Sequence, residues 1–423
     1  MRVLLLGGGG REHALARALA QSPGLGKLFA APGNPGIAAH AELVDLDIVD
    51  GGAVTAWARA HDIGLVVIGP EAPLVAGVAD ALRAAGVRAF GPSAAAARLE
   101  GSKGFTKDLC AEAGIPTAAF RRVRSLPEAL AALAAFGAPV VVKADGLAAG
   151  KGVTVAMTAD EAQAAVRAVF AAPGAEAVIE EFMTGEEASL FVLADGTDMA
   201  VLGAAGDHKR VGDGDTGPNT GGMGAFSPVP ALTPELEARA VAEIVRPTLR
   251  AIAERGTPFS GLLYAGLMLT DGGPKLVEYN VRFGDPECQA LTLRLDDDLL
   301  DLMLATAEGR LASRGPVRLS ADAAVAVVIA ARGYPGTPAS GAAIEGLGDA
   351  ETTGAVIFQA GTAVRGGRLV ATGGRVLAVA GRGFTLAEAA RVAYDGVARV
   401  RYADGFWRGD IAARAGVARG PKG

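Results

Sequence analysis

The first hundred residues alternate short apolar runs with alanine-rich helical stretches, and this alternation constrains the fold more than any other feature. The apolar runs are "RVLLLG" (2–7), "KLFAAPG" (27–33), "LVDLD" (43–47), "GLVVIGP" (64–70) and "RAFGPS" (88–93). Strands that alternate with helices form a parallel sheet with crossover helices. Four of these runs end in turns rich in glycine or proline, and ligands bind at the carboxyl ends of such strands. We therefore predict an α/β fold with a binding site at that edge.

The first of these turns, Gly7–Gly10, is followed by Arg11 at the start of a helix. The dinucleotide fingerprint G-x-G-x-x-G fails, because Glu12 and His13 stand where its third glycine would be. Backbone N–H groups at a helix start still favour a phosphate. A plain tight turn is the alternative.

Composition excludes several classes of protein. The net charge is −6, which argues against a nucleic-acid binder. The two cysteines, Cys110 and Cys288, exclude a disulfide scaffold and make a zinc cluster unexpected. No uncharged apolar run reaches 18 residues, and the apolar start is too short for a signal peptide. We expect a cytoplasmic protein without a membrane span.

Two segments suggest a nucleotide site. "GAPVVVKADGLAAGKGVTVAMT" (137–158) reads as strand, glycine loop, strand, with Lys143 ending the first strand and Lys151 in the loop. The pattern of a P-loop fails, yet such a loop can close over phosphates; a simple hairpin is the alternative. In "VIEEFMTGEE" (178–187), adjacent acids beside Phe182 could meet an adenine edge and ribose hydroxyls. A solvated edge strand is the alternative there.

The segment "LVEYNVRFGDPE" (276–287) carries the sharpest chemical signal. Side chains of a strand alternate between faces, so Glu278, Asn280 and Arg282 share one face. Carboxylate and amide oxygens are ligands for Mg²⁺, with phosphate oxygens completing the shell. Arg282 can clamp a phosphate or carboxylate as a fork. An ordinary amphipathic strand is the alternative.

The stretch "DHKRVGDGDTGPNTGGMGA" (207–225) is too rich in glycine for a helix and has no alternation for a core strand, so we predict a loop. Its glycines would let backbone N–H groups approach an anion closely. No nucleophile paired with a base is visible along the chain. The expected chemistry is phosphoryl transfer by positioning and electrostatic stabilisation.

These segments, with "GGREHALA", "GPEAPLVAGVAD" and "EGSKGFTKD", resemble the phosphoribosylamine–glycine ligase family, the glycinamide ribonucleotide synthetases, within the ATP-grasp superfamily. The resemblance runs from residue 1 to about 415. It implies a preATP-grasp domain (1–102), an ATP-grasp domain (103–320) with a mobile lid near 122–192, and a C-terminal α+β domain (321–423). The implied reaction joins glycine to 5-phosphoribosylamine through glycyl phosphate, with ATP as co-substrate and Mg²⁺ or Mn²⁺ as cofactor.

The resemblance also implies roles for individual residues. Glu278 and Asn280 would hold the metal. Lys143 and Arg282 would stabilise charge, and Asp213 and Asp285 are candidates to take the amine proton. ATP would contact Lys103, Lys143, Gly146, Gly150, Lys151, Gly152, Glu180, Glu181, Phe182 and Glu187. Glycine, its acyl phosphate and phosphoribosylamine would contact Gly8, Gly9, Gly10, Arg11, Glu12, Asn34, Glu71, Lys209, Asp213, Thr216, Asn219, Thr220, Gly221, Gly222, Met223 and Arg282.

Two positions depart from the family's pattern. Gly8 stands where many relatives have asparagine, and apolar Leu269 stands near the place where ATP-grasp enzymes often carry another acid. The second departure leaves the ligands of a second metal ion open.

The expected partners are small molecules only; we expect a monomer, with room for a transient contact to the preceding pathway enzyme. An ATP-grasp ligase with another acceptor, a nucleotide-binding regulator and a nicotinamide dehydrogenase remain alternatives.

Overall fold

The computed structural model describes residues 1–146, 152–418 and 420, and it begins with the predicted parallel sheet. The strands lie in the order β3 (Glu42–Leu43), β2 (Lys27–Pro32), β1 (Arg2–Gly7), β4 (Leu65–Ile68) and β5 (Ala89–Phe90). Every pairing among them is parallel. The predicted helices are α1 (Gly10–Leu19), α2 (Gly51–Ala60) and α4 (Val78–Ala84). The α/β prediction is confirmed, although edge strand β3 is much shorter than the run 43–47.

The sequence predicts a helical connection from about residue 100 to 125, and the structure forms it only in part. Helices α5 (Ala94–Gly101) and α6 (Lys103–Ala113) are joined at Ser102, whose side chain caps α6. Gly114 then adopts φ +65°, a left-handed conformation that ends helices. The chain continues as strand β6 (Phe120–Val123), so the prediction was wrong beyond residue 114.

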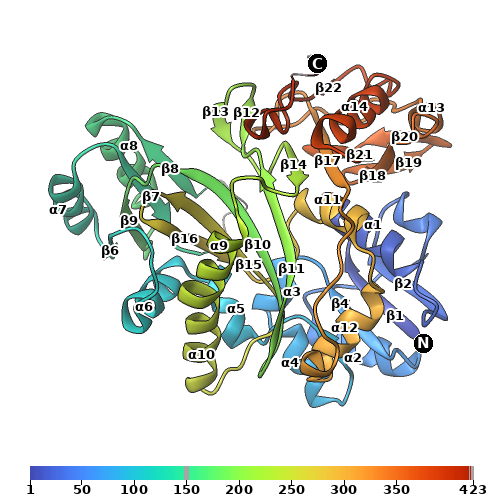
Figure 1. Cartoon of the computed structure of the whole chain (residues 1–423), viewed down its shortest axis with the longest axis horizontal. Helices are drawn as coiled ribbons and strands as arrows, with labels where there is room; N and C mark the ends of the chain where they lie inside the picture. Colours follow the sequence, from blue (N-terminus) through green and yellow to red (C-terminus); the bar gives the residue numbers. More distant parts are fainter. Residues whose placement is uncertain (147–151, 419, 421–423) are drawn as a thin grey trace.

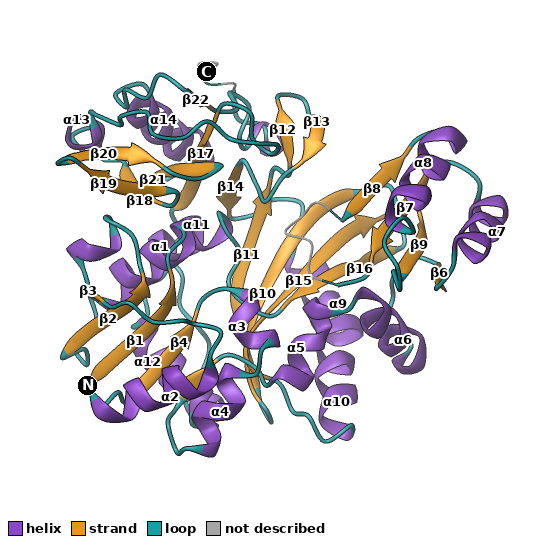
Figure 2. Ribbon diagram, turned by 180° about the vertical axis from the view of Figure 1, so that it is seen from behind, coloured by secondary structure: helices purple, strands orange, loops and turns teal. Residues whose placement is uncertain are grey.

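A small antiparallel sheet follows, in the order β6, β9 (Ala177–Glu181), β7 (Val140–Ala144) and β8 (Val153–Ala156). Helices α7 (Leu126–Phe136) and α8 (Ala159–Val169) cover it and share a separate apolar core with it. Figures 1 and 2 place this unit, which we call the lid, at the opposite end of the molecule from the N-terminal sheet. The strand–loop–strand prediction for 137–158 is confirmed in its two strands by the pairing of β7 with β8.

A large sheet forms the centre of the molecule. Its strands lie in the order β16 (Gly273–Asn280), β15 (Ser260–Thr270), β10 (Glu186–Asp195), β11 (Met199–Asp207), β14 (Gly224–Ser227), β17 (Ala323–Ala331), β21 (Arg375–Gly383) and β18 (Val356–Gln359). Short β22 (Gly405–Phe406) also pairs with β17. The sheet is therefore continuous across residue 320, because β14 joins β11 to β17.

Helices pack around this sheet. Helix α9 (Pro234–Ala240), a π-helical turn (Val241–Val245) and α10 (Arg246–Glu254) follow one another directly as one long helical segment. Helices α11 (Glu287–Arg294) and α12 (Leu299–Ala307) lie between the large sheet and the N-terminal sheet (Figure 1). Near the C-terminus, helix α14 (Leu386–Val397) packs against β21 and β17. Within the described part of the chain, no helix has the length and apolarity needed to cross a membrane.

The segment 207–225 is not the plain loop that we predicted. Strands β12 (Arg210–Gly212) and β13 (Thr216–Asn219) form a hairpin, and the segment ends in buried strand β14. The hairpin turn fits its sequence, because Gly214 adopts φ +69° and Asp215 φ +55°. Residues on short, two-sided polar strands show no alternation of apolar side chains, which is why the pattern missed them.

Candidate active site

A cavity of about 870 Å³ lies where the lid, the large sheet and the N-terminal sheet meet. Eighteen residues that the sequence singled out line it. These are Arg11, Glu71, Lys103, Lys143, Gly146, Gly152, Glu180, Glu181, Phe182, Glu187, Lys209, Asn219, Thr220, Gly221, Glu278, Asn280, Arg282 and Asp285. Residues separated by more than two hundred positions therefore share one cavity.

The lid contributes a buried charge cluster centred on Glu180. Its Oε2 lies 3.0 Å from the Lys143 Nζ and 3.1 Å from the Lys107 Nζ. Glu180 Oε1 has no hydrogen-bond partner among the described residues, although it is buried. Lys107 was missed by the sequence analysis, although it lies in the motif "EGSKGFTKD". Burial lowers the pKa of Lys107, while Glu180 opposes that shift. A buried, unpaired acceptor fits a donor from a ligand.

Lys103 links helix α6 to the glycine loop. Its Nζ donates to the carbonyl oxygen of Gly146 at 2.9 Å, and its backbone N–H donates to Asp145 at 2.6 Å. Burial lowers the pKa of Lys103, and Glu278 and Asp145 oppose that shift. Predicted ATP contacts Gly150 and Lys151 lie outside the described residues. Gly152, which follows them, lines the cavity.

The predicted alternation at 278–282 is confirmed by burial. Glu278, Asn280 and Arg282 are partly exposed to the cavity, while Tyr279, Val281 and Phe283 are buried. The antiparallel register places Gly266 of β15 opposite Glu278. It is apolar Met268, rather than Leu269, that lines the cavity from β15. Strand β15 thus supplies no acidic ligand beside Glu278.

Glu278 and Asn280 offer two oxygen ligands to a metal ion. The described residues contain no cluster of three or more His, Cys, Asp or Glu that could hold one. The Asn280 Oδ1 also accepts a hydrogen bond from Arg282 at 3.1 Å. Two protein oxygens suit Mg²⁺ when phosphate oxygens and water supply the remaining ligands.

Arg282 is held by carboxylates rather than left free as a fork. Its guanidinium lies 2.8 Å from Glu100 Oε1 and 3.3 Å from Glu71 Oε2. Burial alone would lower the pKa of Arg282, but Glu100 and Glu71 outweigh it and raise that pKa. Glu100 was missed, although it opens the motif "EGSKGFTKD". Its own pKa is raised, chiefly by burial.

Lys209 forms a second charge cluster. Its Nζ lies 3.4 Å from Glu187, 3.9 Å from Asp207 and 3.9 Å from Glu278. Burial would lower the pKa of Lys209, but these carboxylates outweigh it and hold the pKa well above the ordinary value. Burial raises the pKa of Asp207 to about 6, with Glu287 and Glu187 adding to the effect and Lys209 opposing it. The cluster connects the predicted ribose residue, Glu187, to the start of the 207–225 segment.

The N-terminal turn is occupied by the protein's own side chains. Glu12 accepts from the Gly9 N–H at 2.7 Å and pairs with Arg11 at 2.5 Å. Asn34 accepts from Gly36 and Ile37 and donates to the carbonyl oxygens of Gly8 and Gln359. A β-carbon at Gly8 would lie 2.5 Å from the Gly33 carbonyl oxygen, so this chain has no room for an asparagine there. Gly8, Gly9, Gly10, Glu12 and Asn34 do not line the cavity.

Four predicted residues of the 207–225 segment also lie outside the cavity lining. Asp213 accepts from the Gly409 N–H at 2.9 Å, and Thr216 donates to the Asp213 carbonyl oxygen. Met223 is fully buried in the core. Gly222 has φ +117°, and a β-carbon there would lie 2.6 Å from Pro286. The resemblance implied substrate contacts for these four, and the structure places them outside the cavity lining.

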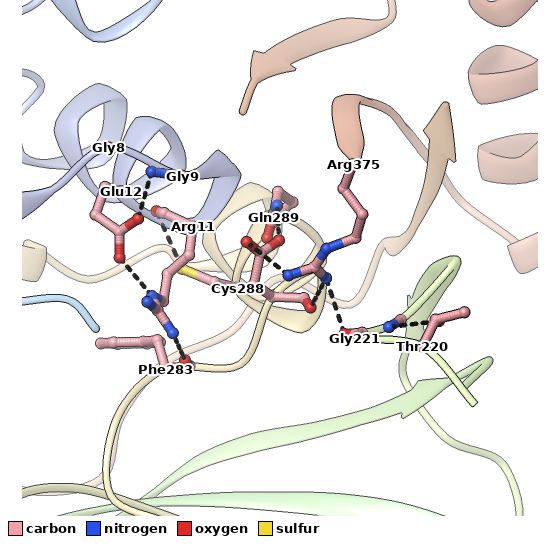
Figure 3. Close-up of polar contacts among 12 residues, drawn as sticks. Gly8, Gly9, Arg11, Glu12, Thr220, Gly221, Phe283, Cys288, Gln289 and Arg375 are labelled. Atoms are coloured by element: carbon pink, nitrogen blue, oxygen red, sulfur yellow. Dashed lines mark hydrogen bonds and ion pairs between the residues drawn. The ribbon is translucent and has the colours of Figure 1, made fainter. Parts of the chain in front are cut away.

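Arginines from the C-terminal hundred residues take part in the site. Arg375 and Arg414 line the cavity. Arg414 donates to the carbonyl oxygen of Asp207. Buried Arg408 pairs with Asp410 at 2.7 Å and Asp215 at 2.8 Å. Figure 3 shows Arg375 reaching Gly221 from the strand above. These residues stand in no recognisable sequence pattern.

Three family models match the chain. The phosphoribosylglycinamide synthetase N domain matches residues 1–100, its ATP-grasp (A) domain 101–288 and its C domain 324–414. Among curated proteins, the phosphoribosylamine–glycine ligase of Mesorhizobium japonicum is 62% identical over 423 residues, covering 99% of each chain. That of Caulobacter vibrioides is 51% identical over 420 residues, covering 98% of each.

Solved structures agree with these matches. The phosphoribosylamine–glycine ligase of Thermotoga maritima superposes with a TM-score of 0.84 and 34% identity, covering 96% of this chain and 99% of that one. Biotin carboxylase from Campylobacter jejuni superposes with a TM-score of 0.71 at 14% identity, covering 96% and 92%. The second likeness concerns the fold alone.

Proposed function

This chain belongs to the phosphoribosylglycinamide synthetase family, and from that premise we propose that it ligates glycine to 5-phosphoribosylamine at the expense of ATP. The products are glycinamide ribonucleotide, ADP and phosphate, a step of purine biosynthesis. The full-length match to curated ligases, together with a cavity that gathers Lys143, Glu278 and Arg282, carries the proposal. The family is one of ATP-grasp ligases.

The reaction proceeds in two steps. A glycine carboxylate oxygen attacks the γ-phosphorus of ATP, the bond to the β–γ bridging oxygen breaks, and ADP leaves. The amine nitrogen of phosphoribosylamine then attacks the glycyl phosphate carbonyl, inorganic phosphate leaves, and the amine loses a proton. The protein's contribution is positioning and charge stabilisation.

We assign the nucleotide to the lid side of the cavity. Lys143 and Lys103 approach the phosphates, because both reach the cavity from the strand and helix that flank the glycine loop. The unpartnered Glu180 Oε1 accepts from the 6-amino group of adenine. Glu187 takes ribose hydroxyls, and its pairing with Lys209 holds it in place.

We assign the divalent cation, Mg²⁺ or Mn²⁺, to Glu278 and Asn280. When bound, the cation neutralises charge on the transferring phosphoryl group. Glu278 is suited to the role because it stays ionised. Burial would raise its pKa, but Lys209, Lys143 and Lys103 outweigh burial and lower it.

Glycine and its acyl phosphate would lie between Arg282 and the segment 219–221. Arg282 stands between the metal ligands and the N-terminal sheet, while Thr220 and Gly221 present backbone at the cavity wall. Asp285 is the one predicted proton acceptor that lines the cavity, so we assign it to the acceptor amine in preference to Asp213.

The first experiment measures ADP release with Mg²⁺–ATP and glycine, with and without phosphoribosylamine generated in situ from ribose 5-phosphate and ammonia. Turnover that needs both substrates, with glycinamide ribonucleotide identified by mass spectrometry, supports the proposal. Turnover with another carboxylate or another acceptor only would keep the ATP-grasp assignment and overturn the substrates. We propose that the enzyme acts in the cytoplasm as a monomer, which sedimentation would test.

A further inference from the structure

Arg375 joins three segments that are remote in sequence. It stands at the start of β21, and its Nη1 donates to the carbonyl oxygens of Gly221, at 2.8 Å, and Asp285. Its Nη2 lies 3.3 Å from Asp285 Oδ2. Figure 3 shows the guanidinium between Gly221 and Gln289. One side chain thus fixes both the 219–221 wall and the turn before α11.

Asp285 has partners on two elements, Gln289 of α11 and Arg375 of β21. Its Oδ1 accepts from the Gln289 Nε2 at 2.7 Å, and its carboxylate oxygens lie 3.5 Å from where β-carbons at Gly9 and Gly10, at the start of α1, would stand. Its side chain is 17% exposed and lines the cavity. The carboxylate therefore occupies the helix start where the sequence led us to expect a phosphate. A phosphate beside this carboxylate would meet a like charge.

The Asp285 carboxylate lines this end of the cavity and is an acceptor that a ligand can reach. An ionised carboxylate only accepts hydrogen bonds. This end of the cavity thus suits a ligand that brings O–H and N–H groups. The ribose hydroxyls and the amine of phosphoribosylamine are such groups.

We propose that Arg375 is a positioning residue for the acceptor substrate. It holds the Asp285 carboxylate and the Gly221 wall so that Asp285 accepts hydrogen bonds from the hydroxyl or amine groups of phosphoribosylamine. This inference rests on the proposed function. The planar guanidinium suits the task, because one nitrogen serves two carbonyl oxygens while the other faces the carboxylate. A lysine ammonium cannot reproduce that fork.

The charges around Asp285 support the role that its contact with Arg375 suggests. Burial alone would raise the pKa of Asp285, but Arg375 and Arg11 outweigh it and lower the pKa. Other charged groups near Arg375 are Glu287 and Arg282. Without Arg375 the carboxyl would therefore protonate at a higher pH, and acceptor binding would fail at a higher pH.

The test compares Arg375→Gln and Arg375→Lys with Arg368→Gln as a matched control. Arg368 is exposed at the start of β20 (Arg368–Ala371) and lies outside the cavity lining. Steady-state kinetics would give kcat/KM for phosphoribosylamine and KM for ATP. Calorimetry would give Kd for two stable ligands, glycinamide ribonucleotide and ADP.

We expect Arg375→Gln and Arg375→Lys to lower kcat/KM for phosphoribosylamine by about 100-fold, since misplacing a substrate by about 1 Å costs that much. Glycinamide ribonucleotide should bind correspondingly more weakly, while KM for ATP and Kd for ADP stay within about twofold, the precision of such comparisons. The acid limb of the pH profile should move to higher pH. Arg368→Gln should match the wild type.

Equal losses for ADP and glycinamide ribonucleotide would mean that Arg375 only supports the fold, and would overturn the inference. So would full recovery in Arg375→Lys, or an unchanged acceptor affinity in both variants. If Arg375→Gln does not fold, Arg375→Lys decides alone by the same criteria. A wild type that makes no glycinamide ribonucleotide would instead overturn the proposed function, which separates the two failures.

Discussion

Glu278 carries its charge at the point where the nucleotide side and the acceptor side of the cavity meet. Three lysines lower its pKa against the effect of burial. Its Oε1 lies 3.9 Å from the Lys209 Nζ, too far for a strong hydrogen bond, so the carboxylate is available to a cation. A glutamine at this position keeps the shape and removes the charge.

We predict that Glu278→Gln lowers turnover by about 100- to 1000-fold, the cost of losing one preorganised electrostatic contact. The thermal unfolding midpoint should stay close to that of the wild type. Glu243→Gln serves as the control, because the Glu243 carboxylate is 39% exposed and pairs with Arg239 one helical turn away, outside the cavity lining. A folded Glu278→Gln enzyme with near-normal turnover would contradict the metal assignment.

Asp207 makes stability depend on pH near neutrality. Its pKa is raised to about 6 by burial, so the folded protein binds a proton there more tightly than the unfolded chain does. The contribution to stability is complete below the unfolded pKa near 4 and is lost as pH rises through 6.

We predict that the free energy of unfolding of the wild type, relative to Asp207→Asn, falls by about 1 kcal/mol between pH 5 and pH 7. Urea unfolding followed by tryptophan fluorescence at several pH values measures the difference. A difference that is constant or rises with pH would show that Asp207 is ionised throughout.

At the scale of elements, the β12–β13 hairpin depends on the C-terminal segment. Arg408 is 1% exposed, pairs with Asp410 and Asp215, and donates to the Arg210 carbonyl oxygen at 2.9 Å. The Asp410 carboxylate in turn accepts from the Gly214 N–H at 2.7 Å. The hairpin has little apolar surface of its own, so these charged contacts hold it beside the cavity.

We predict that Arg408→Met destabilises the protein by about 3 kcal/mol, because it leaves a buried carboxylate without its partner. Arg391→Met, which breaks an exposed pair with Asp395, should cost less than about 1 kcal/mol. Urea unfolding gives both values. Limited proteolysis should cut Arg408→Met within residues 210–219 sooner than the control, and equal rates would contradict the role of Arg408.

At the scale of the whole molecule, the cavity lies between the lid and the large sheet. The lid has its own small core, and the described residues that line the cavity come from both units. An acyl phosphate intermediate must be kept from water, so closure of the lid over the bound nucleotide is the expected motion.

We predict that Mg²⁺ with a non-hydrolysable ATP analogue slows amide hydrogen exchange in β7 and β8 of the lid, with no change in β1 and β4. Protein–nucleotide contacts would suppress local opening of the lid strands. Removal of the cation with EDTA should reverse part of the protection. Equal protection in the N-terminal sheet would indicate a general stabilisation in place of closure.

The sequence by itself determined the features that depend on neighbours along the chain. The alternation of strands and helices in the first hundred residues gave the parallel sheet, and a period of two placed Glu278, Asn280 and Arg282 on one face. Lys143 at the end of its strand was likewise visible locally. Such patterns arise because backbone geometry repeats every two or 3.6 residues.

Only the tertiary structure decided which groups meet across the chain. Arg375 reaches Asp285 over 90 positions, and Arg11 reaches the Phe283 carbonyl oxygen over 272. It also decided that Asp285 occupies the helix start predicted for a phosphate. No local period records such pairs, because sheet pairing and packing bring them together after the elements form. The acceptor end of the site therefore comes from the packing of the N- and C-terminal parts, whereas the nucleotide end could be read from short motifs.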